Sequence, residues 1–173
     1  MPIRFVVSNE TTPTCDPLSS LIADVTEDAA LSVCRTTANL PSHPVVKTTA
    51  LSDIHLDGVG GCVNFAGTLS GGVYLLMSEP LARRITARIL GSDKVEMQEI
   101  KDVIGELTNQ VAGGLKNRLA AAGFESKLTI PTFIRAEKTT IKARHVSIST
   151  SNSIRVGSTE DLLHVRVLAK KMA

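Results

Sequence analysis

Three polar residues, Asp102, Glu106 and Asn109, have types and a spacing that suit chemistry on the surface of a helix. They stand at i, i+4 and i+7, so they share one face of an α-helix that turns 100° per residue. A carboxylate can pair with a cationic group, and a carboxamide offers both donors and an acceptor without titrating. Gly113 lies on the same face, one helical turn after Asn109, and carries only a hydrogen atom as its side chain. The face is therefore polar and flat, which suits a partner that approaches the helix closely.

The segment around these residues has the pattern of the longest helix in the chain, from about residue 96 to 122, ended by Gly123. Its apolar residues form a second stripe, about 170° around the helix from the polar one. Any surface helix shows such a polar face, so the pattern alone does not establish a function. Two successive glycines, Gly113 and Gly114, cost about 1 kcal/mol each against alanine and indicate close packing near the backbone. The apolar stripe consists of Met97, Ile100, Ile104, Leu107, Val111 and Leu115.

The remaining sequence predicts an α+β fold with a mostly antiparallel sheet and helices packed on one face. We expect an N-terminal arm over residues 1–15 and a single domain over residues 16–173. Glycines in the stretch 57–61 are interpreted as a turn, and Ser70-Gly71-Gly72 as a hairpin turn. Further helices are predicted at about 17–37 and 79–91. Extended segments are predicted at 45–56, 62–69, 73–77, 126–134, 139–150, 153–157 and 162–169.

Composition excludes several functional classes. The net charge of +2 gives no electrostatic footprint for nucleic acid, and four Phe, one Tyr and no Trp leave little for base stacking. No apolar run approaches the 18 or so residues of a membrane span. Three widely spaced cysteines, Cys15, Cys34 and Cys62, lack a C-x-x-C pair and fit reduced thiols. These features predict a cytoplasmic protein.

Other candidate sites are weaker. Asp53, His55 and Asp57 alternate along an extended segment and could share one face, which permits metal ligation, but a fourth ligand is missing. We interpret them as a solvent-facing strand edge. Cys62 opens a predicted strand without a base nearby, which indicates core packing. Two histidines in predicted strands are interpreted as surface or hydrogen-bonded residues: His145 and His164.

The stretch IGELTNQVAGGLKNRLAAAGFESKLTIPTFI, residues 104–134, resembles the signature of the CheC/CheX family of chemotaxis response-regulator phosphatases. The signature places Asp or Ser at Asp102, Glu at Glu106, Asn at Asn109 and a proline at Pro131. The Gly-Glu-Leu-x-Asn core and the Ile-Pro-Thr segment bring the chain closest to CheX. CheC proteins carry a second Glu/Asn site in their first helix, and this chain lacks one. The resemblance spans about residues 16–169 and is specific over residues 100–134.

The resemblance implies a phosphatase that accelerates hydrolysis of the aspartyl phosphate of a CheY-like receiver. Asn109 would position the attacking water, and Glu106 would pair with the active-site lysine of the receiver. Asp102 would be a supporting polar contact, and Gly113 would let the receiver backbone come close. Mg²⁺ is expected on the receiver, and no cofactor or metal is expected in this chain. The alternative is a non-catalytic CheX-like signalling module that binds a receiver domain or another signalling protein.

A homodimer is also expected, because CheX-type chains pair through sheet edges and exposed edges invite partner strands. Pro131 interrupts one ladder, so strand 126–134 should lie at an edge or carry a bulge. The apolar faces for this pairing would come from the C-terminal strands, through Ile154, Val156, Val165 and Val167.

Overall fold

The computed structural model describes residues 16–49, 53–158 and 160–172, and the predicted arm over residues 1–15 lies outside them.

The ends of the helices follow the capping residues of the sequence. Ser78 Oγ accepts a hydrogen bond from the backbone N–H of Leu81 and so caps the second helix, which ends at Gly91 with a φ of 64°. A capping box joins Glu96 and Glu99 at the start of the third. The helices are α1 (Pro17–Thr36), α2 (Glu79–Leu90) and α3 (Met97–Ala121), each within one residue of its predicted bounds.

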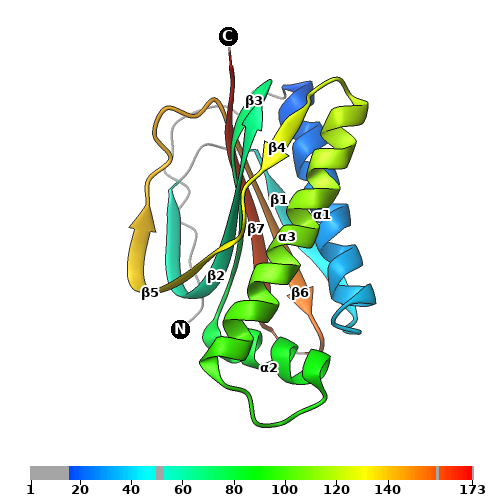
Figure 1. The fold of residues 1–173 in the computed structure, drawn as a ribbon, viewed down its shortest axis with the longest axis vertical. Coiled ribbons are helices and arrows are strands. Elements are labelled where there is room, and N and C mark those ends of the chain that lie inside the picture. The colour runs from blue at the N-terminus through cyan, green and yellow to red at the C-terminus, as the bar shows by residue number, and fades with distance from the viewer. Residues whose placement is uncertain (1–15, 50–52, 159, 173) are drawn as a thin grey trace.

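The described strands form one antiparallel sheet. Its order is β1-β6-β7-β3-β2, and both β4 and β5 pair with the outer edge of β2. The strands are β1 (Ser42–Thr48), β2 (Ile54–Gly67), β3 (Leu69–Met77), β4 (Ser126–Leu128), β5 (Thr132–Ile141), β6 (Ile148–Val156) and β7 (Leu162–Lys171). Figure 1 shows α1 and α3 side by side across one face of the sheet and α2 at one end. The predicted α+β class with helices on one face is confirmed.

The main core lies between this face of the sheet and the helices. Alternation along β3 shows how it is built: Val73, Leu75 and Met77 point into the main core, whereas Leu76 belongs to a smaller cluster on the other side. The four strand residues assigned to a dimer interface are almost fully buried in the main core, so they are not available to a second chain. The predicted role of Ile154, Val156, Val165 and Val167 in pairing is therefore wrong.

The glycines of the stretch 58–61 do not form a turn, as the sequence predicted, but lie within the continuous strand β2. A β-bulge falls between Leu56 and Gly58, and Gly58 has a φ of 151° that favours glycine. A Cβ at Gly61 would overlap the side chain of Thr108 on α3. These glycines therefore serve close approach of β2 to its neighbours rather than reversal of the chain. The hairpin turn comes earlier than predicted, between the end of β2 at Gly67 and the start of β3 at Leu69.

The segment around Pro131 carries the predicted edge position and irregularity. β4 and β5 both run along β2, with Leu128 opposite Phe65 and Thr132 opposite Cys62. Three residues, 129–131, thus stand opposite two on β2, which is one extra residue, as in a bulge. The predicted strand 126–134 is split there, and the predicted strand 139–150 is divided between β5, which ends at Ile141, and β6, which begins at Ile148. Among the described residues, no helix is long and apolar enough to cross a membrane.

Candidate functional site

The polar and apolar faces of α3 lie as the helical spacing predicted. The apolar stripe is buried against the sheet and α1, apart from Met97, which is partly buried. On the opposite side Asp102, Glu106 and Asn109 are all exposed. The structure therefore brings the three predicted residues together on one exposed face.

Three close contacts fix α3 in place. Thr108 lies against Gly61 of β2, and its hydroxyl donates to the Ile104 carbonyl at 2.6 Å. Gly114 faces α1, where a Cβ would lie 3.0 Å from Cβ of Ala29. The close packing predicted from the paired glycines is thus confirmed for Gly114. These contacts hold the backbone beneath the polar face, so its side chains start from a rigid support.

The third contact involves the loop between β4 and β5. A Cβ at Gly105 would lie 3.6 Å from Cβ of Pro131, so the signature proline packs beside the helix one residue before Glu106. Gly105 and Asn109 are four residues apart and are neighbours on the helix surface. The loop residue Ile130 is 85% exposed. An exposed isoleucine thus lies in the loop that packs beside Gly105, a feature that the sequence pattern did not predict.

Side-chain amides of neighbouring glutamines donate hydrogen bonds to the carboxylates of Asp102 and Glu106, whereas the Asn109 carboxamide faces solvent. Gln98 Nε2 donates to Asp102 Oδ1 at 3.0 Å, and Gln110 Nε2 donates to Glu106 Oε1 at 3.0 Å. Within the described part of the chain, no hydrogen bond occupies the Asn109 carboxamide. Its donors and acceptor face solvent, where they can bind a water molecule and a partner group together.

Two further residues join the site. Gln110 Oε1 accepts a hydrogen bond of 2.9 Å from Thr37 Oγ1, at the end of α1. The sequence shows that Gln110 lies one helical turn from Glu106. The contact with Thr37 joins residues 73 positions apart, so only the folded structure reveals it.

The helix surface at Gly113 is open. A Cβ added at Gly113 would meet no atom of the described residues within 4 Å.

The site is a convex helix surface. Neither of two open clefts, of about 530 and 780 Å³, is lined by Glu106 or Asn109, although Thr37 lines the second. Small-molecule sites are concave and enclose most of their ligand. An exposed helix face is instead suited to enter the pocket of a protein partner.

The weaker candidates do not form a second centre. Asp53 Oδ1 accepts from the Ala143 N–H at 3.2 Å, and His55 Nδ1 lies 3.0 Å from Thr140 Oγ1. The described residues contain no group of His, Cys, Asp and Glu side chains that could hold a metal ion. Cys62 is buried, which confirms core packing, and this burial raises the pKa of its thiol and so disfavours the thiolate.

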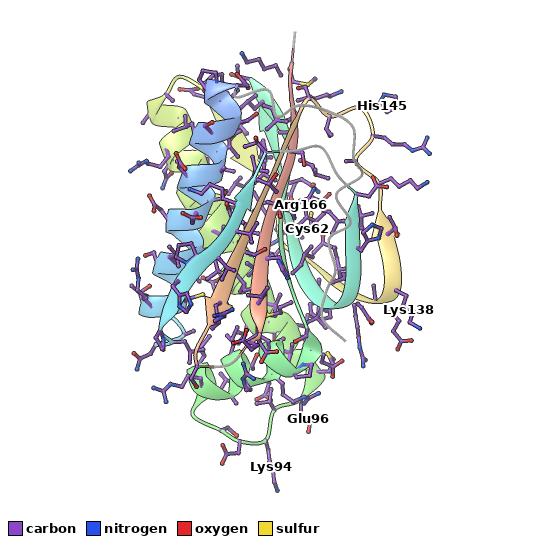
Figure 2. The ribbon with its side chains drawn as sticks, turned by 180° about the vertical axis from the view of Figure 1, so that it is seen from behind. Cys62, Lys94, Glu96, Lys138, His145 and Arg166 are labelled. Atoms are coloured by element: carbon purple, nitrogen blue, oxygen red, sulfur yellow. The ribbon has the colours of Figure 1, made fainter. Side chains whose placement is uncertain are left out.

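The histidines also behave as structural or surface residues. Burial, and then the charge of Arg166, lower the pKa of His164 to about 4, and its Nδ1 lies 2.9 Å from Ser153 Oγ. Figure 2 shows Arg166 within the sheet and His145 near the outer end of the loop after β5. His145 is exposed. Both interpretations from the sequence are confirmed.

Comparison with solved structures shows the same fold. A putative chemotaxis protein from Desulfovibrio vulgaris Hildenborough has 21% identity and a TM-score of 0.76, over 86% of this chain and 96% of that one. The chemotaxis protein CheX from Vibrio vulnificus has 22% identity and a TM-score of 0.76, over 86% and 99%. A chain in the CheX-CheY-BeF3-Mg complex from Borrelia burgdorferi has 21% identity and a TM-score of 0.68, over 86% and 97%.

No curated protein sequence matches the chain. The family model for chemotaxis phosphatase CheX matches residues 59–155, more than half of the chain, and includes the whole of α3 and Pro131. The chain therefore belongs to the CheX family of chemotaxis phosphatases.

Proposed function

We propose that this chemotaxis phosphatase hydrolyses the aspartyl phosphate of a CheY-like receiver by inserting the Glu106/Asn109 face of α3 into the active site of the receiver. The observation that carries the proposal is the pair itself: an open carboxamide and a carboxylate, three residues apart on a helix fixed by its neighbours. The complex of CheX with CheY, BeF3 and Mg²⁺ from Borrelia burgdorferi, a relative in fold, supports the choice of partner.

Asn109 would act on water. Hydrolysis of an acyl phosphate needs a water molecule in line with the bond that breaks, and catalysis of phosphoryl transfer is largely positioning and electrostatics. The Asn109 carboxamide can accept from the water and donate to a phosphoryl oxygen at once. Because it does not titrate, it needs no tuned pKa. Asn109 is therefore the proposed catalytic residue that orders the attacking water.

Glu106 would anchor the helix. Its exposed carboxylate can form a charge-assisted hydrogen bond with the active-site lysine of a receiver. Only one of its oxygens, Oε1, accepts from Gln110 among the described residues, which leaves Oε2 for the lysine. Asp102, one turn earlier, would supply a further polar contact at the rim. Any Mg²⁺ in the complex would be bound by the receiver, and we propose no metal or cofactor for this chain.

Gly113 is proposed to give the receiver backbone room, and this makes a prediction with two opposite effects. Gly113→Ala should raise the free energy of unfolding by up to about 1 kcal/mol, because alanine favours the helix and the added Cβ meets no atom within 4 Å. The same methyl group should lower affinity for the receiver. Chemical denaturation and a receiver titration measure the two effects. A variant that is more stable and binds as tightly as wild type would remove Gly113 from the interface.

A homodimer is proposed through the β1 edge rather than through the C-terminal strands. Among the described strands, β1 has a neighbour on one side only, β6, and it exposes Val45 and Val46. Such an edge can pair with a second copy. The helix that packs against β1 is α1, whereas Glu106 and Asn109 lie on α3, so both sites of the proposed dimer would stay open.

Sedimentation at micromolar concentration should give twice the chain mass of 18.4 kDa for wild type. Val46→Lys should shift the protein toward monomer, since a charge on an edge strand opposes pairing. A wild-type monomer would contradict the dimer, and a variant that stays dimeric would place the interface elsewhere.

The protein is proposed to work in the cytoplasm, together with its receiver.

Two measurements on one phosphorylated CheY-like receiver test the proposed function. Loss of aspartyl phosphate should be faster with the protein than without it, and the protein should bind the phosphorylated form. Binding without faster loss would instead identify a non-catalytic signalling module. Neither binding nor faster loss, across receivers from the same cell, would contradict the proposal.

A further inference from the structure

A chain of two hydrogen bonds connects α1 to the Glu106 carboxylate. Thr37 Oγ1 donates to Gln110 Oε1 at 2.9 Å, and Gln110 Nε2 donates to Glu106 Oε1 at 3.0 Å. The ionised Glu106 carboxylate can only accept, so the NH₂ group of Gln110 faces Glu106, and the amide oxygen is left to accept from the Thr37 hydroxyl. A side chain at the end of α1 thus holds Gln110 at the end of the amide opposite to the carboxylate.

The anchor at the start of this chain is firmly held. The backbone N–H of Thr37 donates to the Val33 carbonyl at 3.0 Å, and the next residue, Ala38, is 2% exposed. Farther up the helix, Ala29 packs against Gly114, where an added Cβ would lie 3.0 Å from Cβ of Ala29, so α1 and α3 are in close contact. Thr37 therefore has a fixed position relative to the site.

The pair of Gln98 and Asp102 offers a comparison on the same helix face. It has the same i, i+4 spacing and the same 3.0 Å amide–carboxylate distance. Asp102 is exposed, and the structure gives Gln98 no bond to another element among the described residues. Gln110 differs because it is partly buried and is held at its other end by Thr37. The second bond sets it apart from an ordinary surface pair.

We propose that Thr37 and Gln110 are positioning residues that hold Glu106 ready for the receiver lysine. The proposal rests on the docking role proposed for Glu106. An exposed glutamate samples several rotamers, and fixing it during association costs entropy. The bond from Gln110 restricts the side chain in advance and leaves Oε2 open for the lysine. Thr37 and Gln110 should therefore favour docking and have little influence on the water held by Asn109.

The test is the dependence of phosphate release on receiver concentration in variants of Thr37. Thr37→Val keeps the shape and removes the donor, so KM should rise about three- to tenfold, the usual effect of one hydrogen bond. The rate at saturating receiver, kcat, should stay near the wild-type value because Asn109 is intact. Thr37→Ser retains the hydroxyl and should restore most of the affinity.

Thr36→Val is the matched control. Thr36 precedes Thr37 on the same helix, and its hydroxyl donates to the Ser32 carbonyl at 2.8 Å, away from the site. This variant should keep the wild-type KM. Equal KM values for Thr37→Val and Thr36→Val, with an active wild type, would overturn the positioning role and leave the proposed function standing. A wild-type protein that neither binds nor dephosphorylates the receiver would overturn both.

A second comparison separates positioning from a general effect on folding. In a Glu106→Ala background, Thr37→Val and Gln110→Met should cause no further rise in KM, because the side chain that they hold is gone. Each should raise KM when Glu106 is present. Additive effects in the double variants would show that Thr37 and Gln110 act on the fold instead, and would contradict the inference.

Discussion

Asn109→Ala is expected to abolish the acceleration of receiver dephosphorylation while affinity for the receiver stays close to that of wild type. The side chain is exposed and has no hydrogen bond to the described residues, so its loss should not disturb α3. Water would then no longer be held in line, and the receiver should lose its phosphate at its intrinsic rate. Phosphate release measured against receiver alone, together with a binding titration, checks both parts.

Asn117→Ala provides the control, because Asn117 is an exposed asparagine on α3 outside the proposed site. It should retain wild-type activity. Full phosphate release by Asn109→Ala would show that another group orders the water. Loss of both binding and turnover would instead assign Asn109 to docking.

Glu106→Gln is expected to weaken receiver binding by about 1–3 kcal/mol, the range for a hydrogen bond to a charged group. Glutamine keeps the size of the side chain and removes the charge that the lysine requires. Wild-type affinity should fall with added salt, and the variant should show less of this dependence. A titration of the receiver at two ionic strengths measures both effects.

Glu125→Gln removes one carboxylate just beyond the end of α3 and has the same effect on net charge. Glu125 is exposed and has no assigned role in the site. Its affinity should match that of wild type. Equal affinities for Glu106→Gln and wild type would show that Glu106 is not in the interface. They would also contradict the positioning role proposed for Thr37 and Gln110.

The sequence predicted α3 well because its two faces repeat with the helical period over 25 residues. Burial of Ile104 and Leu107 on one side, and exposure of Glu106 and Asn109 on the other, follow from spacing alone. Capping residues likewise placed the ends of α2 and α3. These are local signals, because they depend on residues that are near one another in the sequence.

The glycines of the stretch 58–61 were mispredicted because local rules associate clustered glycines with turns. Their actual cause is tertiary: Gly61 faces Thr108, nearly fifty residues away on α3. The exposed Ile130 and the bond from Thr37 to Gln110 were missed for the same reason. Such features depend on which elements become neighbours, and helical or strand periodicity carries no information about that.

A single-turnover experiment shows directly whether the protein hydrolyses the aspartyl phosphate of a receiver. A phosphorylated CheY-like receiver is mixed with an excess of the protein, and the first-order decay of its aspartyl phosphate is followed beside receiver alone. If Asn109 orders the attacking water, decay should be faster with wild type and should fall to the rate of receiver alone with Asn109→Ala, at concentrations where the variant is bound. Equal decay with and without the wild-type protein, at concentrations where binding is complete, would contradict the proposed function.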